Sequence, residues 1–307
     1  MTQAGLIPKI VEDIRRGRAT SLDAYLMTIE AAVSLNDTKT LFYMHLIAKD
    51  GNGNIRLNDF IEFIVNHIIS YAIPRSKIAE AVKKDTEEGL TRHISRLHEE
   101  AKKLFTPLKK SGEGGEMLLF ILGEALLGLP QLFCKMSVKT SGKVHVHGTD
   151  GIHLGVDANG KPELYWGESK LYKDFKAALK ACVESIKPYL KRESGHEDLL
   201  LLQTHLDLAD EKRTKAIKAL LDKDNPAFND VSYCGLCFIG FDKNLYQKST
   251  QDNDIKEFCE ECQGDIAKKL IESELSEAKI HFFCLPVTSV EEFRNLFLQR
   301  LGLNNGG

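Results

Sequence analysis

Residues 147–172 read HGTDGIHLGVDANGKPELYWGESKLY, and this stretch decides the fold of the second half of the chain. Asn159-Gly160 lies between two runs of alternating apolar and polar residues, a pattern typical of a β-hairpin. If residues 158–160 form a three-residue loop with Gly160 in the left-handed conformation, Asp157 pairs with Lys161. The register of the whole hairpin follows from that pair.

This register places Asp150 opposite Glu168, with Lys170 two residues further along the same face. Cβ atoms of opposite residues lie roughly 4.5–5.5 Å apart, and two carboxylates at that separation repel each other unless a cation lies between them. Mg²⁺ prefers such hard oxygen ligands. The same face continues with the apolar residues Ile152, Leu154, Val156, Leu164 and Trp166. We therefore predict a partly buried site in which Asp150 and Glu168 bind Mg²⁺, or Mn²⁺ in its place.

Phosphodiester hydrolysis is the chemistry that this set suits. A bound metal lowers the pKa of a water molecule, and a lysine beside it stabilises charge in the transition state. We accordingly predict Asp150, Glu168 and Lys170 as catalytic residues. The alternative is a plain cross-strand charge pair on an exposed hairpin. The tripeptide alone decides nothing, because Glu100-Ala-Lys102 and Glu277-Ala-Lys279 match it within helical patterns.

A third metal ligand is expected from the helix that precedes the hairpin. Glu116 opens this helix after a run of glycines, and Glu124 lies further along it. We favour Glu116 and leave Glu124 open. An acidic residue at a helix start also has a purely structural explanation, because it interacts favourably with the helix dipole.

The chain divides into two segments, residues 1–110 and residues 111–307, at the proline- and glycine-containing stretch 106–115. The first segment is expected to be α+β and to contact a partner. It contains helical spacing at 22–35, a strand at 41–47, and helices at 59–72 and 76–105 separated by Pro74. The second is expected to contain helices at 116–127, 173–191, 197–224, 253–277 and 290–301, with strands at 131–140, 143–157, 162–172, 232–242 and 279–287. This alternation predicts an α/β fold.

The second segment resembles the PD-(D/E)xK restriction-endonuclease-like core, which consists of a helix, a three-stranded antiparallel meander, a helix, and a further strand and helix. Asp150-x17-Glu168-Ser169-Lys170 carries this resemblance, with Thr149 in place of the motif's proline. More narrowly, the chain resembles the HamA family of the Hachiman anti-phage defence system, on Gly115-Glu116, Gly148-Thr149-Asp150-Gly151, Trp166-Gly167-Glu168-Ser169-Lys170 and Cys237 to Asp242. The resemblance implies a DNA nuclease that works with a superfamily 2 helicase (HamB-like) and degrades DNA when infection disturbs DNA integrity.

The formal net charge of −3 restricts how the chain could bind DNA. Proteins that bind DNA alone usually carry a basic surface, so here the basic surface must be local, or a partner must supply it. Lys173, Lys176, Lys180 and Lys187 lie along one helix and suit contacts with phosphates, although for any single lysine a solvated helix face is the more usual explanation.

Other metal patterns are weaker. Cys234-x2-Cys237 and Cys259-x2-Cys262 have zinc-like spacing, but they fall in an apolar strand and a helical pattern, so we expect buried thiols rather than zinc. We expect the seven cysteines to be reduced. Asp50-x-Asn52-x-Asn54 lacks the later ligands of a calcium loop and indicates a turn. His145, His147 and His153 lie near Asp150 but more often form hydrogen bonds than bind metal.

The leading hypothesis is a Mg²⁺-dependent deoxyribonuclease that acts as the effector of a defence complex. A non-catalytic subunit that docks on a helicase or on nucleic acid is the main alternative, and a zinc-ribbon interaction protein is a third reading. No apolar run approaches the roughly 20 residues of a membrane span, and the N-terminus lacks the features of a secretory signal. We expect a cytoplasmic protein without a membrane contact.

Overall fold

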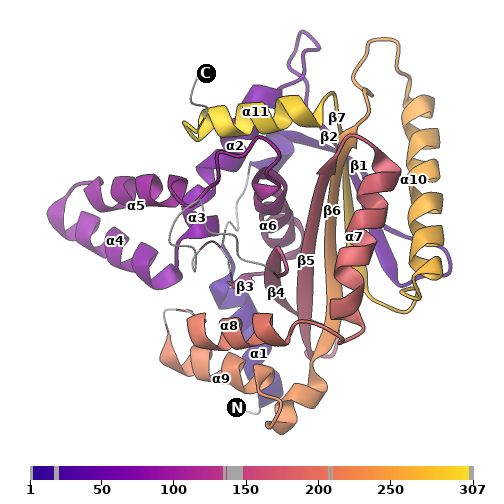
Figure 1. The fold of residues 1–307 in the computed structure, drawn as a ribbon. Coiled ribbons are helices and arrows are strands. Elements are labelled where there is room, and N and C mark those ends of the chain that lie inside the picture. The colour runs from indigo at the N-terminus through magenta and orange to yellow at the C-terminus, as the bar shows by residue number, and fades with distance from the viewer. Residues whose placement is uncertain are drawn as a thin grey trace.

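The computed structural model describes residues 3–16, 21–133, 136, 148–206, 208 and 210–303. In this part of the chain, eleven α-helices surround one seven-stranded mixed sheet (Figure 1). The first half contains α1 (Gln3–Ile14), β1 (Leu26–Ser34), β2 (Thr40–Ile47), α2 (Leu57–Asn66), α3 (Ile68–Ala72), α4 (Arg75–Glu88) and α5 (Arg92–Lys102). The second half contains α6 (Glu113–Leu127), β3 (Gln131–Phe133), β4 (Gly151–Val156), β5 (Pro162–Tyr172), α7 (Phe175–Leu190), α8 (His196–His205), α9 (Glu211–Leu221), β6 (Ser232–Asp242), α10 (Asp252–Glu272), β7 (Ile280–Val287) and α11 (Val290–Arg300).

The α/β class is confirmed, and the described elements of residues 111–307 follow the predicted order. The strand predicted at 131–140 is described only as β3, and residues 143–147 of the next predicted strand lie outside the described residues. Assignment to the PD-(D/E)xK core stays a prediction.

The helix predicted at 22–35 is wrong, because Leu22–Ala24 form a single 3-10 turn and Leu26–Ser34 form strand β1. Two register shifts interrupt its pairing with β2, one between Thr28 and Glu30 and one between Glu30 and Val33. Each irregularity breaks the two-residue alternation of a strand, and the apolar spacing that remains imitates a helix. The helix predicted at 76–105 is in fact two helices, which turn at Gly89 with a φ of +66°.

The strand order is β1-β2-β7-β6-β5-β4-β3. β3, β4 and β5 are antiparallel neighbours, whereas β5, β6, β7 and β2 are parallel to one another, and β1 is antiparallel to β2. The pairing of β2 with β7 joins the two segments of the chain, since it runs from Thr40↔Ile280 to Met44↔Cys284. Residues 1–110 and 111–307 therefore share one sheet.

A separate apolar core lies on each face of the sheet. On β5, Tyr165 and Leu171 belong to the core that contains α6, whereas Leu164 and Trp166 belong to the core that contains α7. Figure 1 shows α6 and α7 on opposite sides of β5. Because side chains alternate along a strand, Glu168 and Lys170 share the face of Trp166.

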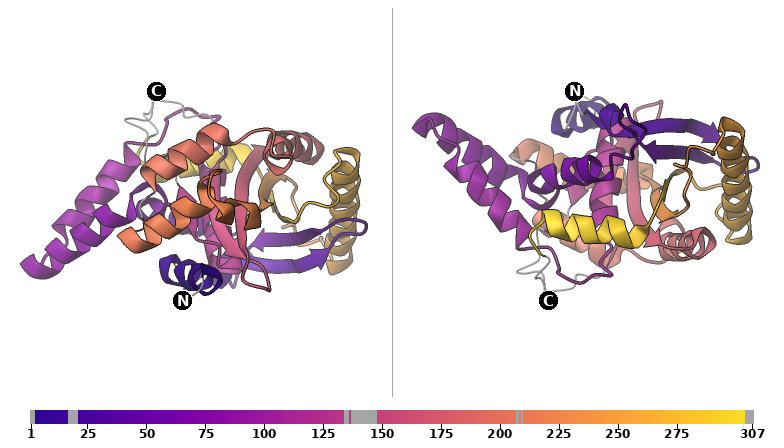
Figure 2. Two further views of the ribbon diagram at one scale, coloured as in Figure 1. Left: turned by 90° about the horizontal axis from the view of Figure 1, so that it is seen from below. Right: turned by 90° about the horizontal axis from the view of Figure 1, so that it is seen from above.

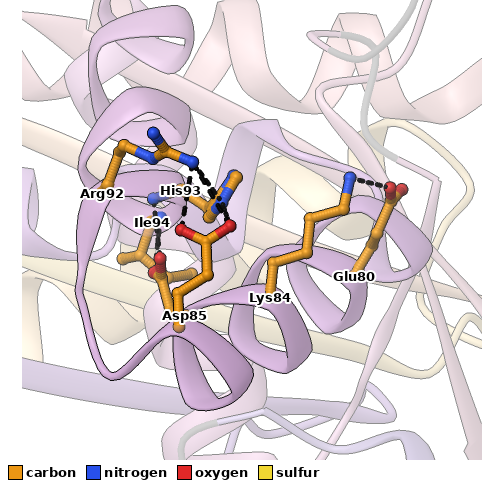
Figure 3. A network of polar contacts seen from close by, with 7 residues as sticks. Glu80, Lys84, Asp85, Arg92, His93 and Ile94 are labelled. Atoms are coloured by element: carbon orange, nitrogen blue, oxygen red, sulfur yellow. Dashed lines mark hydrogen bonds and ion pairs between the residues drawn. The ribbon is translucent and has the colours of Figure 1, made fainter.

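Helices α4 and α5 form an arm that projects away from the sheet (Figure 2). Asp85 fixes their junction, since its carboxylate accepts the backbone N–H groups of His93 at 2.8 Å and Ile94 at 2.9 Å (Figure 3). Ion pairs join Lys84 to Glu80 and link Glu88 to the start of α5. The arm thus has its own polar network.

Among the described helices, none combines the length and the apolar character that a membrane span requires.

Candidate active site at the fork of β4 and β5

The predicted register of the β4–β5 hairpin is confirmed. Paired residues run from Gly151↔Gly167 to Val156↔Pro162. The N–H of Asp157 donates to the carbonyl of Lys161 at 2.9 Å, and Gly160 has a φ of +79°. The turn at Asn159-Gly160 therefore sets the register as far as Gly151↔Gly167, and Asp150 comes directly before the paired residues.

The two strands separate at Asp150, and we call this point, with the side chains of Asp150, Glu168, Ser169 and Lys170, the fork. The N–H of Asp150 donates to the carbonyl of Gly167 at 3.0 Å, and β5 then continues to Tyr172. The carboxylate accepts hydrogen bonds from the backbone N–H (2.8 Å) and the hydroxyl (3.1 Å) of Ser169, the residue between Glu168 and Lys170. Asp150 precedes the first paired residue of β4, so strand alternation does not dictate its direction. It lies against Ser169 rather than simply facing Glu168 across the ladder.

Glu168 and Lys170 form an ion pair within the fork. Glu168 is buried, and Lys170 Nζ donates to its Oε1 atom. Burial of the Lys170 ammonium acts to lower its pKa, but the charge of Glu168, their hydrogen bond and the charge of Asp150 together raise it. The fork therefore contains two carboxylates and a lysine that stays protonated at neutral pH.

Gly115 explains how closely α6 approaches this fork. A Cβ atom at Gly115 would lie 3.1 Å from the Leu171 side chain and 3.4 Å from the hydroxyl of Ser169. Ser169 in turn holds Asp150. A side chain at Gly115 would therefore press on the residue that positions the aspartate.

The two candidate third ligands have different surroundings. Buried Glu124 accepts the backbone N–H groups of Arg16 at 2.5 Å and Gln131 at 3.0 Å, and Arg75 lies 3.9 Å away. Burial raises the pKa of Glu124. These contacts tie the end of α6 to β3. Eight residues of helix separate Glu124 from Glu116, or about 12 Å.

Glu116 lies in the first turn of α6, and the hydroxyl of Tyr71 donates to its Oε2 atom at 3.2 Å. In the part of the chain that the structure describes, no three His, Cys, Asp or Glu residues are grouped as metal ligands. Asp150, Glu168 and Glu116 therefore stay predicted metal ligands.

Asp198 on α8 is a residue that the sequence analysis missed. Its buried carboxylate accepts the backbone N–H of Thr149 at 3.3 Å. The Thr149 hydroxyl donates to the carbonyl of Gly167 at 2.6 Å. Burial raises the pKa of Tyr189 to about 12, with smaller contributions from the charges of Asp198, Glu168 and Asp150. Asp198 therefore borders the fork and holds the segment that leads into Asp150.

The sequence does contain one signal for Asp198. Gly148 has a φ of +124°, and a Cβ atom there would lie 2.2 Å from Asp198 Oδ1. A glycine directly before the predicted Thr149-Asp150 pair indicates a close approach by another part of the chain. Only the fold identifies that part as α8.

A model of the HamA family matches residues 24–301. The chain belongs to the HamA family. Membership supports a role in Hachiman anti-phage defence. The matched range contains the whole fork, including Asp150, Glu168, Lys170 and Asp198. No curated protein matches the sequence.

The four cysteines with zinc-like spacing do not converge in this HamA chain. Cys234 packs in the core on the α6 side, whereas Cys237 packs in the core on the α7 side. Residues three apart on a strand point to opposite faces, which explains the separation. Cys259 and Cys262 are buried on α10.

Other polar residues of this HamA family member form contacts within the fold. His153 is buried with Nδ1 2.9 Å from the carbonyl of Leu129, and burial lowers its pKa to about 4. His145 and His147 lie outside the described residues. Asp50 accepts the N–H groups of Asn52 and Asn54, which confirms the predicted turn. Three lysines at α7 form ion pairs: Lys173 with Glu291, Lys176 with Asp265, and Lys180 with Glu184.

Proposed function

We propose that this protein is a metal-dependent DNA nuclease, the effector of a Hachiman defence complex that contains a superfamily 2 helicase (HamB-like). The observation that supports the proposal is the fork, where the Asp150 carboxylate lies against Ser169 and the neighbouring residues Glu168 and Lys170 form an ion pair. Burying Glu168 close to a second carboxylate costs free energy unless cations lie nearby, so the presence of both acids at the fork supports a cation site there.

The donor set fits Mg²⁺, or Mn²⁺ in its place. Asp150 and Glu168 supply oxygen ligands only, and Mg²⁺ is commonly held by one or two carboxylates together with waters and phosphate oxygens. A Mg²⁺ ion bound there would supply a water of lowered pKa and would polarise the phosphate.

The residues of the chain have separate tasks in this proposal. Lys170 is protonated, and its ion pair with Glu168 fixes the position of its ammonium. In this proposal the ammonium donates to a non-bridging phosphate oxygen and stabilises charge in the transition state. Ser169 fixes Asp150 through two hydrogen bonds, and Asp198 fixes the backbone that precedes it. These contacts preorganise the fork before a substrate binds.

Plasmid cleavage tests the proposal. Supercoiled DNA is incubated with Mg²⁺ and the purified chain, with and without the helicase, and Glu168→Ala is compared with the unchanged protein. We expect cleavage that needs Mg²⁺ and falls at least about 100-fold in Glu168→Ala, the usual scale for loss of one electrostatic catalytic group. Glu277→Ala is the matched control, because Glu277 belongs to a second Glu-x-Lys tripeptide and pairs with Lys39 on the surface. Equal cleavage by Glu168→Ala and Glu277→Ala would refute the nuclease site.

A non-catalytic docking subunit is the second candidate, and the α4–α5 arm favours it. The arm projects from the sheet in both views of Figure 2, and it exposes Val82 (49%) and Leu90 (56%). A partner that covers these side chains would bury apolar surface. Co-purification with the helicase that is lost in Leu90→Asp, without any Mg²⁺-dependent cleavage by the complex, would support this function over the nuclease.

A further inference from the structure

A cleft of about 480 Å³ lies at the end of β5. Its walls come from β5, the first turn of α7, α11 and the segment before α6. These elements come together where β5 ends and the chain turns into α7 in Figure 1. The charged side chains in the lining are Lys110, Lys173, Arg294 and Asp174. Three cations and one carboxylate give the lining a net charge of +2, whereas the whole chain has a net charge of −3. The lining is thus locally basic on an acidic protein, with the carboxylates of Glu291 and Asp242 next to its cations.

The cleft begins on β5 one residue beyond Lys170 of the fork. Tyr172 in its wall follows Lys170 by two residues on the same face of β5, a separation of about 7 Å in a strand. Leu171 also lines the cleft and packs where Gly115 leaves room, beside Ser169. Arg294 Nη2 donates to the carbonyl of Leu171 at 2.5 Å, which fixes the guanidinium beside the strand. A polymer bound at the fork would therefore extend into this cleft.

Tyr172 gives the cleft a second chemical property. Its side chain is 40% exposed, and it is the one aromatic among the large apolar side chains exposed in the described ranges. An exposed aromatic ring beside cationic groups is the combination by which proteins bind single-stranded nucleic acid, since bases stack on the ring and phosphates contact the cations. A base within a duplex is already stacked between its neighbours and is not available to stack on the Tyr172 ring.

The existing ion pairs leave the cations available to a phosphate. Lys173 Nζ lies 3.4 Å from Glu291, and both side chains are mostly exposed, so this pair is weak and screened by solvent. The single carboxylate of the lining, Asp174, accepts the N–H of Ala177 at 2.7 Å as the N-cap of α7. Its charge is directed into the helix start rather than toward the cations.

We infer that this cleft binds an unpaired DNA segment next to the phosphate at the fork. Tyr172 stacks on a base, while Lys110, Lys173 and Arg294 contact the backbone phosphates. The inference rests on the proposed nuclease function and deepens it, because it makes unpaired DNA the preferred substrate at this site.

Fluorescence anisotropy with the full chain tests the inference. The probes are a fluorescein-labelled oligothymidylate and a blunt duplex, both in EDTA so that no metal-dependent cleavage occurs. We expect Tyr172→Ala to weaken oligothymidylate binding by about tenfold or more, the usual effect of removing one base–aromatic stack. Tyr172→Phe keeps the ring and should bind as the unchanged protein does. Duplex binding should be equal for all three.

Lysine variants test the electrostatic half of the inference. Lys110→Ala should weaken binding to both probes and reduce the salt slope for the oligothymidylate by about 0.7, the value for one phosphate contact on a single strand. Lys83→Ala on the α4–α5 arm is the matched control and should change neither.

The outcomes separate the inference from the proposed function. Unchanged oligothymidylate binding in Tyr172→Ala, or an equal loss for the duplex, overturns the inference while Mg²⁺-dependent plasmid cleavage can still stand. A selective loss in Tyr172→Ala together with no cleavage by the unchanged protein supports the cleft and refutes the nuclease.

Discussion

Gly148→Ala is expected to damage both stability and cleavage, because an alanine Cβ there would lie 2.2 Å from Asp198 Oδ1. Non-glycine residues at such a φ carry about 1–3 kcal/mol of strain. Displacing Asp198 also removes its hydrogen bond from Thr149, and bonds to charged groups contribute about 1.5–3 kcal/mol. The free energy of unfolding should therefore fall by about 3–5 kcal/mol. Urea denaturation measures this loss.

Gly53→Ala is the matched control for backbone strain. Gly53 has a φ of +83°, and nothing lies within 4 Å of the position of its Cβ atom. It should lose only the backbone strain, about 1–2 kcal/mol. In an Asp198→Ala background the collision partner is absent, so the cost of Gly148→Ala should approach that of Gly53→Ala. Equal losses for Gly148→Ala and Gly53→Ala in the original background would refute the role of Asp198.

Cleavage gives the functional readout of the same change. Moving the Thr149 backbone displaces Asp150, and a misplacement of about 1 Å at a reacting group can cost about 100-fold in rate. Plasmid nicking under conditions in which Gly148→Ala remains folded should show a loss of this order, whereas Gly53→Ala should cleave normally. A folded Gly148→Ala protein with full activity would show that Asp198 does not position the fork.

Three further changes test other parts of the structure. Thr149→Val removes the buried hydroxyl that donates to the carbonyl of Gly167, and urea denaturation should show a free energy of unfolding lower by about 1–2 kcal/mol. Thr149→Ser keeps the hydroxyl and should lose much less. Equal losses in Thr149→Val and Thr149→Ser would contradict this role of the hydroxyl. Burial lowers the pKa of His153 to about 4, so the folded state resists protonation, and stability that is present above pH 6.5 is lost as pH falls toward 4. In His153→Gln the loss of stability between pH 7 and pH 5 should be about 2 kcal/mol smaller. An unchanged pH profile in this variant would exclude His153 as the origin of the loss. Asp85→Ala removes the cap of α5, so amide exchange should accelerate in α5 but not in β6, and uniform acceleration would indicate global destabilisation instead.

Local chemistry made the hairpin predictable. Asn159-Gly160 requires a tight turn, and with the turn fixed, strand geometry determines every pair up to Gly151↔Gly167. That is why Asp150, Glu168 and Lys170 could be brought to one end of the hairpin before any fold was known. The apolar patterns of α6, β6 and β7 are likewise regular, and each was expected from its own residues.

Contacts between distant segments decided the rest. β1 appears helical in sequence because its bulges are defined only by pairing with β2, and β2 enters the sheet only by pairing with β7. The direction of Asp150 depends on Ser169, and the segment before it depends on Asp198, which lies 48 residues further along the chain than Asp150. The basic cleft draws its residues from several elements. The sequence by itself determined the hairpin and its charged end, because those depend on neighbouring residues. Only the tertiary structure could supply the residues that hold that end in place, because their positions depend on how the remote elements pack.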